Sequence, residues 1–158
     1  MNRRDVLISG SLLSLATALG FRANASEGDF PFMLSDAAWQ ERLSPAAYRV
    51  LRHEDTERPF TSPLNDEKRA GIFHCAGCDQ ALFSSEKKYD SGTGWPSFWD
   101  FIPGAIGTKE DNSLFMTRVE VHCSNCGGHQ GHVFEDGPPP TGLRYCINGL
   151  SLRFEPAA

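Results

Sequence analysis

The sequence is short of positive charge, and this shortage limits its partners. It has 15 Lys and Arg residues against 20 Asp and Glu residues, a formal net charge of −5 over 158 residues. Without residues 1–25, 12 basic and 19 acidic residues remain. Nucleic acids and anionic membranes attract basic surfaces. The composition therefore argues against both kinds of partner, and against a zinc ribbon that binds nucleic acid.

The N-terminal apolar run is too short to cross a bilayer. It extends from Leu7 to Phe21, about 15 residues, whereas a spanning helix needs about 20. The pair Arg3 and Arg4 precedes it, and the A-x-A site that ends at Ala25 follows it. This pattern predicts a twin-arginine signal peptide over residues 1–25, cleaved after Ala25, and a periplasmic or otherwise exported bacterial protein. The alternative is an uncleaved membrane anchor.

There is no internal repeat and no second domain in the sequence. After a leader over residues 26–34, residues 35–156 are predicted to form one domain, which we expect to be monomeric. Ser35 and Ser44 can cap short helices over 36–43 and 45–53. Strands are predicted over 72–74, 81–83, 113–121, 132–134 and 143–154, with an irregular glycine-rich segment over 89–98. The expected fold is mainly β, with short antiparallel strands and two N-terminal helices.

Four of the five cysteines form two Cys-x-x-Cys pairs. Cys75 pairs with Cys78, and Cys123 pairs with Cys126. Two such pairs can supply the four thiolates of a closed, structural Zn²⁺ site. Two disulfides are the alternative, since the predicted compartment is oxidising. Neither pair precedes a helical pattern, as a redox Cys-x-x-Cys site usually does, and this favours zinc.

The fifth cysteine, Cys146, lies in a segment with the alternation of a β-strand. Tyr145 and Ile147 are predicted to face the core, and Arg144 and Cys146 to share the opposite face. A hairpin turn is predicted at Asn148 and Gly149. A lone thiol beside an arginine is a candidate nucleophile, because the cation can stabilise the reactive thiolate. The alternative is a small buried hydrophobic residue.

Polar and aromatic residues that could complete a site lie in two glycine-rich segments. His129 and His132 follow the second cysteine pair, and Trp95 lies in the segment 91–98. Taken singly, each is more often structural than functional. Together with the cysteines, they form a pattern that matches a known family.

The sequence resembles the B-type methionine sulfoxide reductases, also called the SelR family. The matching segments are 57–61, Cys75 to Cys78, 92–98, Cys123 to Cys126, 131–134, 136–138 and 142–148, and the similarity extends from about Ser35 to Phe154. The resemblance implies two small antiparallel sheets, a β-tent, with zinc away from the active site. It also implies reduction of the R epimer of methionine sulfoxide in oxidised proteins or peptides.

The resemblance assigns roles to residues of this sequence. Cys146 is the implied nucleophile, in a pocket with His129, His132, Asp136, Arg144 and Asn148, and Trp95 and Phe98 are implied to contact the substrate. The histidines are candidate proton donors to the sulfoxide oxygen. Many relatives carry a second, resolving cysteine at the position of Thr93. This chain has none, so we expect an external, thioredoxin-like thiol to reduce the sulfenic acid of Cys146.

Two other functions stay open at this point. A zinc-stapled module could bind peptides without chemistry, in which case Cys146 would be unreactive. Another thiol enzyme could use the same fold, with a reactive Cys146 but no sulfoxide reduction.

Overall fold

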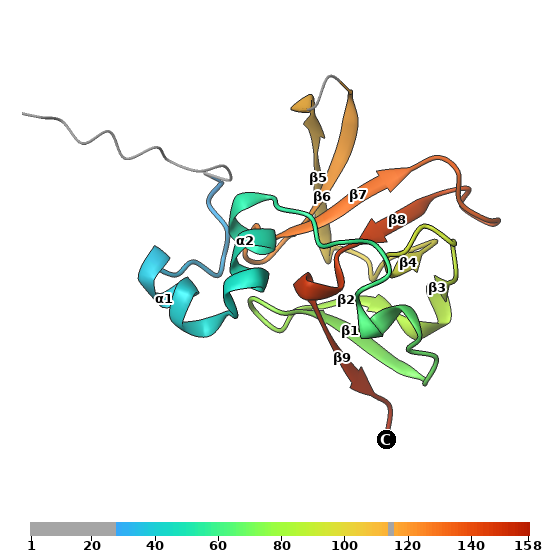
Figure 1. The fold of residues 1–158 in the computed structure, drawn as a ribbon, viewed down its shortest axis with the longest axis horizontal. Coiled ribbons are helices and arrows are strands. Elements are labelled where there is room, and N and C mark those ends of the chain that lie inside the picture. Colours follow the sequence, from blue (N-terminus) through green and yellow to red (C-terminus); the bar gives the residue numbers. More distant parts are fainter. Residues whose placement is uncertain (1–27, 114–115) are drawn as a thin grey trace, which may run out of the picture.

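Two antiparallel β-sheets of unequal size form most of the protein. The computed structural model describes residues 28–113 and 116–158, so the predicted signal peptide over 1–25 lies outside the described residues. The smaller sheet has the order β2 (Ala81–Ser84), β1 (Gly71–Cys75) and β9 (Leu152–Pro156). The larger has the order β3 (Lys88–Tyr89), β4 (Ser97–Phe98), β8 (Arg144–Ile147), β7 (His129–Phe134), β6 (Arg118–Cys123) and β5 (Ile106–Asp111). Figure 1 shows β9 and β1 below and the β5–β6 hairpin above.

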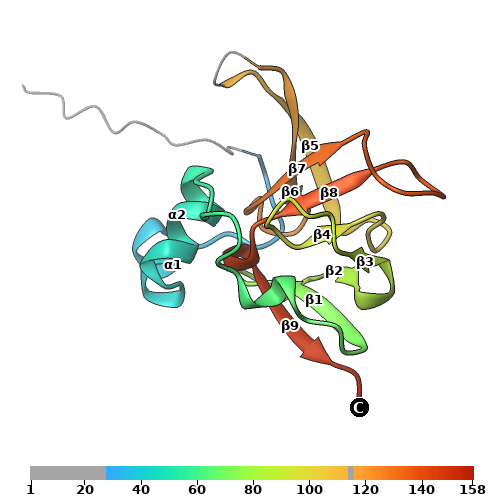
Figure 2. The same ribbon diagram turned by 45° about the vertical axis from the view of Figure 1, so that its right-hand side comes forward.

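The two helices form where capping residues predicted them. In α1 (Asp36–Arg42) and α2 (Pro45–His53), the hydroxyls of Ser35 and Ser44 accept hydrogen bonds from the backbone N–H groups of Ala38 and Ala47. Val50 and Leu51 lie on the buried face of α2. Both helices lie at the same side of the sheets in two views (Figures 1 and 2). None of the described helices is long and apolar enough to span a membrane.

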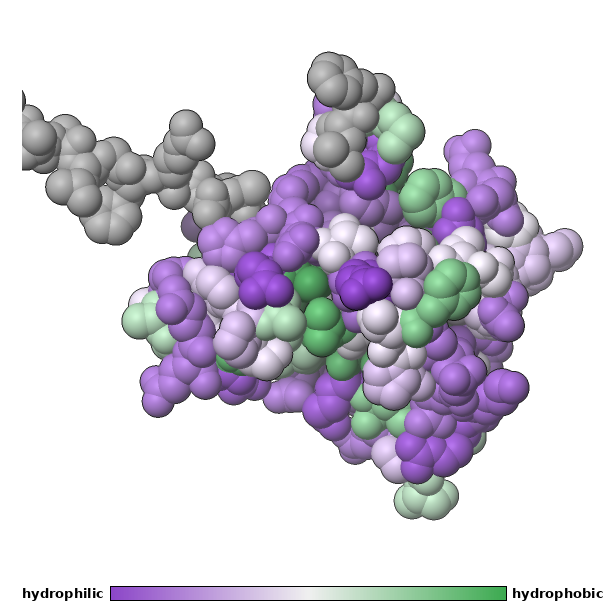
Figure 3. Space-filling view, viewed as in Figure 1, coloured by the Kyte–Doolittle hydropathy of each residue, from purple (hydrophilic) through white to green (hydrophobic). Residues whose placement is uncertain are grey.

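Aromatic rings fill the space between the sheets. Phe73 and Phe83 of the smaller sheet contact Phe98 of the larger one, with Phe83 and Phe98 stacked at 4.4 Å between ring centroids. Tyr145 and Ile147 are buried from the same face of β8. The predicted alternation along β8 is therefore confirmed, and it leaves Arg144 and Cys146 on the face away from this core. On the face of the molecule shown in Figure 3, hydrophilic residues cover most of the surface, and hydrophobic residues gather near the middle.

The predicted hairpin at Asn148 and Gly149 is wrong. A type I′ hairpin turn needs positive φ at both central residues, but Asn148 has φ −65° and leads into a short 3₁₀ helix, η4 (Gly149–Ser151). The Glu57 carboxylate accepts hydrogen bonds from the N–H groups of Gly149 and Leu150. This distant segment holds the chain in the 3₁₀ turn, so β8 and β9 belong to different sheets.

The strand predicted over 113–121 is confirmed in part, and residues 114–115 lie outside the described residues. The structure has β6 over Arg118–Cys123 and an additional strand, β5, which the sequence did not indicate. β5 lies at the edge of the larger sheet and pairs with β6 alone. Its sequence, IGTKED, has one large apolar residue and four consecutive charged or polar ones. Edge strands are often charged, so the apolar alternation that identifies a strand is missing here.

Candidate active site and metal centre

Cross-strand pairing places Cys146 at the centre of a polar row on the outer face of the larger sheet. Cys146 pairs with Ser97 of β4 and with His132 of β7, and His132 pairs with Glu120 of β6. Directly paired residues project from the same face of a sheet. Gly131 allows the close approach of β7, because a Cβ there would lie 2.0 Å from the carbonyl oxygen of Cys146. The sheet register therefore brings the thiol and one imidazole together.

The Cys146 thiol opens into a small pocket. The pocket has a volume of about 110 Å³ and is lined by Thr56, Trp95, Arg118, Gly131, His132, Phe134, Cys146 and Asn148. Trp95 is held in the wall by a hydrogen bond from its indole N–H to the carbonyl of Glu57, at 3.1 Å. The pocket thus combines a thiol, an imidazole and an aromatic ring, which can together hold a small group with an apolar end and a polar end.

Two carboxylates that the sequence did not indicate orient the histidines. Asp111 accepts a hydrogen bond from Nε2 of His132, at 2.7 Å, and Glu120 accepts one from Nδ1 of His129, also at 2.7 Å. Burial lowers the pKa of His132, and the bond to Asp111 only partly opposes this effect. His132 is therefore a neutral imidazole protonated at Nε2, with its lone pair on Nδ1, and can accept and return a proton.

Glu120 remains ionised although it is buried. Burial by itself raises the pKa of Glu120, but hydrogen bonds from His122 and His129 outweigh it and bring the pKa down to about 2. Nε2 of His129 is buried and has no hydrogen-bond partner among the described residues. His129 lies behind His132, with 5.4 Å between ring centroids, and does not line the pocket. His132 is the better placed of the two for proton transfer.

Arg144 is beside Cys146, but its guanidinium forms an ion pair with the Asp136 carboxylate. Two bonds of 2.8 Å join the guanidinium to the carboxylate, and this pair holds the pKa of Asp136 below its ordinary value. Burial raises the pKa of the Cys146 thiol, and the lowering by Thr93 and Arg144 is smaller. Arg144 lowers the pKa of Cys146, as expected of a neighbouring cation, but burial outweighs this effect and the thiol is protonated in the substrate-free protein.

We expect the alkylation of Cys146 to be slow at neutral pH. Since only the thiolate reacts and the pKa of Cys146 is raised, the rate with iodoacetamide should still increase with pH beyond about 8.5, the ordinary cysteine value. Mass-spectrometric counting of modified Cys146 against pH measures this. A rate that levels off near pH 6 would instead show a thiol ionised at rest.

Two other residues predicted for the site, Asn148 and Phe98, have structural contacts, whereas Thr93 lies beside Cys146. Asn148 lines the pocket, but its amide donates to the carbonyl of Gln130 and accepts from the N–H of Glu57. Thr93 places its hydroxyl 3.9 Å from the Cys146 sulfur. Phe98 does not belong to the pocket. It is fully buried in the core, because it pairs with Tyr145 and so projects from the other face of the sheet.

The four paired cysteines form a cluster that fits one metal ion. The sulfur atoms of Cys75 and Cys126 are 3.7 Å apart, those of Cys78 and Cys123 are 3.5 Å apart, and all four lie within 4.8 Å of one another. A tetrahedral site with metal–sulfur bonds of about 2.3 Å has sulfur–sulfur separations of about 3.8 Å. A disulfide needs about 2.05 Å. The geometry therefore favours a four-thiolate metal site over two disulfides.

The cluster joins the two sheets. Cys75 ends β1 of the smaller sheet, and Cys123 ends β6 of the larger one. Each partner follows in a tight turn, with Asp79 at φ 61° and Gly127 at φ 68° just beyond the pairs. A bound ion would be closed off by four protein ligands, so its contribution is structural.

The SelR domain family model matches residues 43–156. The chain belongs to the SelR family. Three relatives named peptide methionine sulfoxide reductase MsrB support this membership. The protein of Agrobacterium fabrum is 54% identical over 77% of this chain and 91% of its own. That of Methanosarcina barkeri is 56% identical over 77% and 86%, and that of Thioalkalivibrio sulfidiphilus is 54% identical over 82% and 95%.

SelR membership agrees with the geometry of the site. Three of the segments that carried the resemblance, 92–98, 131–134 and 142–148, supply residues of the pocket, and the two cysteine pairs form the metal cluster. The mainly β fold with two antiparallel sheets, predicted from the SelR resemblance, is confirmed.

Proposed function

We propose that the protein reduces the R epimer of methionine sulfoxide in oxidised proteins and peptides. The observation that carries this proposal is the pairing of Cys146 with His132 in one pocket beside Trp95, in a chain of the SelR family. A sulfoxide needs a nucleophile at sulfur and a proton at oxygen, and the pocket offers one of each. A peptide-binding module would need neither.

In the first step, the Cys146 proton passes to Nδ1 of His132 and the thiolate attacks the sulfoxide sulfur. The sulfoxide oxygen takes the proton from the imidazolium, and the oxygen is transferred to Cys146. Methionine leaves as the thioether, gaining two electrons, while Cys146 loses two and becomes a sulfenic acid. Because the thiol starts protonated, the step needs no external proton. The Asp111 carboxylate stabilises the imidazolium when it forms.

The Trp95 ring selects the substrate methyl group. It forms an apolar wall of a pocket whose other side carries Cys146 and His132. With the methyl on the ring and the oxygen toward the imidazole, only one epimer presents its sulfur to Cys146. The test is incubation with the separate R and S sulfoxides of N-acetyl-methionine amide, with dithiothreitol as reductant. We expect methionine from the R epimer, and at least ~100-fold less from the S epimer, about 2.7 kcal/mol in the barrier. Equal reduction of both would contradict the epimer assignment.

Recycling needs an external thiol. Two equivalents of thiol return the sulfenic acid to the thiol form, with one disulfide and one water as products. We infer a thioredoxin-like protein as donor, since the other four cysteines of the chain gather in the metal cluster and Thr93 has no thiol to offer.

Replacing Thr93 with cysteine should create an internal route. The Thr93 hydroxyl is 3.9 Å from the Cys146 sulfur, so a movement of about 2 Å would bring two sulfurs to bonding distance. After one turnover without reductant, mass spectrometry should find a disulfide between positions 93 and 146 in Thr93→Cys. The wild type should instead give a sulfenic acid that dimedone traps. An internal disulfide to Cys146 in the wild type would refute the external route.

We further propose that the metal is Zn²⁺, held by Cys75, Cys78, Cys123 and Cys126, and that the protein is exported after cleavage of residues 1–25. Four thiolates in tetrahedral spacing suit zinc. The twin arginine and the A-x-A site support export, and the twin-arginine route would let the domain load its metal before crossing the membrane.

A further inference from the structure

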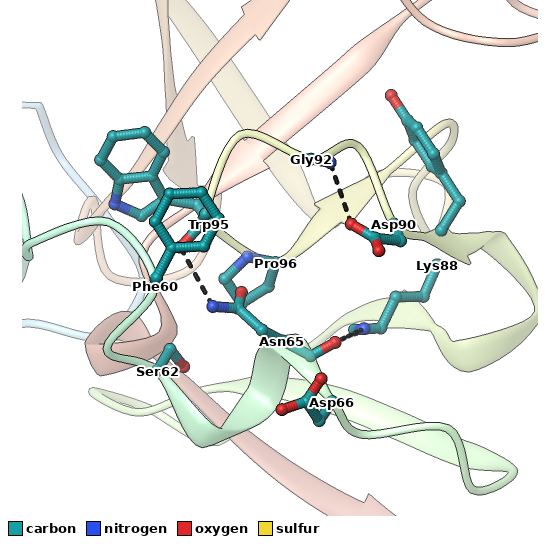
Figure 4. Close-up of a pocket in the computed structure, with 11 residues that line it drawn as sticks. Phe60, Ser62, Asn65, Asp66, Lys88, Asp90, Gly92, Trp95 and Pro96 are labelled. Atoms are coloured by element: carbon teal, nitrogen blue, oxygen red, sulfur yellow. Dashed lines mark hydrogen bonds between the residues drawn. The ribbon is translucent and has the colours of Figure 1, made fainter.

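A second, larger pocket also has Trp95 in its lining (Figure 4). Its volume is about 330 Å³, and its lining includes Phe60, Asn65, Lys88, Asp90 and Trp95. Figure 4 shows the rings of Phe60 and Trp95 at one end of it and Lys88 and Asp90 at the other. Trp95 is common to this pocket and to the catalytic one. The indole is therefore a wall that the two pockets share.

The volumes of the two pockets suggest that they hold different parts of a substrate. Pockets that bind ligands usually measure about 300–1,000 Å³. The catalytic pocket, at about 110 Å³, has room for a side-chain end and not for a peptide. The second pocket, at about 330 Å³, is large enough for a neighbouring residue of a polypeptide.

Phe60 is displayed in an exposed position by a constrained backbone. Its side chain is 72% exposed, and its backbone has φ 62°, a conformation that a bulky residue seldom adopts. Its N–H donates to the carbonyl of Gly94, at 2.7 Å. A Cβ on Gly94 would lie 2.8 Å from the Phe60 nitrogen, so the two segments are in close contact. The strained backbone of Phe60 thus holds an aromatic ring in solvent next to Trp95.

Asn65 adds a hydrogen-bond acceptor that has no partner. Its Nδ2 donates to the carbonyl of Gly94, at 3.0 Å, while its buried Oδ1 has no hydrogen bond among the described residues. A buried acceptor without a partner costs about 1–3 kcal/mol. Because this oxygen is covered in the ligand-free protein, the Asn65 amide must rotate before a backbone N–H of a bound peptide can donate to it.

The charges around the pocket are of both signs. The Lys88 ammonium donates to the backbone carbonyl of Asn65, at 2.8 Å, and Asp66 and Asp90 are exposed. Because one ammonium offsets only one of the two carboxylates, the rim disfavours acidic residues. Recognition falls to the Phe60 ring and the Asn65 oxygen.

We infer that this pocket binds the polypeptide segment next to the oxidised methionine, with an uncharged apolar side chain against Phe60 and a backbone N–H at Oδ1 of Asn65. The inference rests on the proposed function and extends it, since it makes peptides better substrates than the blocked amino acid. Phe60 and Asn65 act in substrate binding alone and take no part in proton or oxygen transfer.

The test compares two substrates, N-acetyl-methionine-R-sulfoxide amide and a pentapeptide with a central methionine-R-sulfoxide flanked by leucines. For Phe60→Ala we expect kcat/KM to fall about tenfold with the pentapeptide, mainly through KM, because a buried apolar contact is lost. With the blocked amino acid it should change less than twofold. Phe60→Tyr keeps the ring and should retain the preference. The control is Met33→Ala, which removes an exposed apolar residue outside both pockets.

The outcomes separate this inference from the proposed function. If the wild type reduces the blocked amino acid but Phe60→Ala loses activity equally with both substrates, Phe60 only supports Trp95 and the peptide subsite is refuted, while the function stands. If Phe60→Ala loses activity with neither, the pocket holds no substrate. If the wild type reduces neither substrate, both the function and the subsite fail.

Discussion

Replacing Cys146 with serine is expected to abolish methionine sulfoxide reduction, by at least ~10⁴-fold in kcat/KM, while the fold and the metal cluster remain. Serine differs by one atom, and its hydroxyl ionises far less readily than a thiol, so it cannot supply the attacking anion at neutral pH. Cys146 is also outside the four-cysteine cluster. The measurement is the rate of methionine formation from the blocked R sulfoxide, together with circular dichroism and zinc content.

Thr93→Ser is the matched control for this substitution. It keeps a hydroxyl at the position whose oxygen lies 3.9 Å from the Cys146 sulfur, so it changes the pocket without removing the nucleophile. We expect it to retain most of the activity. Sulfoxide reduction by Cys146→Ser at a substantial rate would remove Cys146 from the mechanism and return the chain to the peptide-binding alternative.

The candidate nucleophile, Cys146, could be singled out from the sequence because its signals are local. Alternation along β8 is a property of consecutive residues, and it correctly separated Tyr145 and Ile147 from Arg144 and Cys146. The cysteine pairs are equally local, because a two-residue spacing suffices to direct two sulfurs at one ion. The helix caps at Ser35 and Ser44 are local as well, because each serine bonds to a backbone N–H three residues later.

The surroundings of the nucleophile depend on pairing between strands, which one sequence does not specify. Asp111 and Glu120 reach the histidines from β5 and β6. The sequence carried no signal for Glu120, because its alternation with Val119 and Val121 predicts a solvent-facing glutamate, whereas the structure buries it. Phe98 was expected to contact the substrate, but its pairing with Tyr145 directs its side chain into the core.

The pKa of Cys146 could not be predicted from neighbours along the strand. The sequence shows that a cation is adjacent, but the balance depends on burial and on the Asp136 carboxylate that occupies the guanidinium of Arg144. A thiol protonated at rest has a chemical advantage, since it resists alkylation and oxidation until a sulfoxide brings an oxygen that needs its proton.

Removal of the metal should unfold the domain. Structural zinc in small domains contributes about 10–16 kcal/mol of apparent binding free energy, comparable with the whole stability of a typical domain, about 5–15 kcal/mol. Here the ion would join β1 of one sheet to β6 of the other through Cys75 and Cys123. Even a loss of ~5 kcal/mol would lower Tm by ~20 °C, at about 4 °C per kcal/mol.

Cys123→Ser tests this, with Cys146→Ser as the matched control because it removes the one cysteine outside the cluster. We expect one zinc per chain in the wild type and in Cys146→Ser, and loss of both zinc and the native Tm in Cys123→Ser. Titration of thiols in the denatured wild-type protein should find all five cysteines reduced. Two disulfides and no metal would overturn the zinc assignment. Activity should be lost along with the zinc, because Glu120 is three residues before Cys123 and His129 is three residues after Cys126. By holding Cys123 and Cys126, the metal would also fix the positions of Glu120 and His129, which are joined by a hydrogen bond.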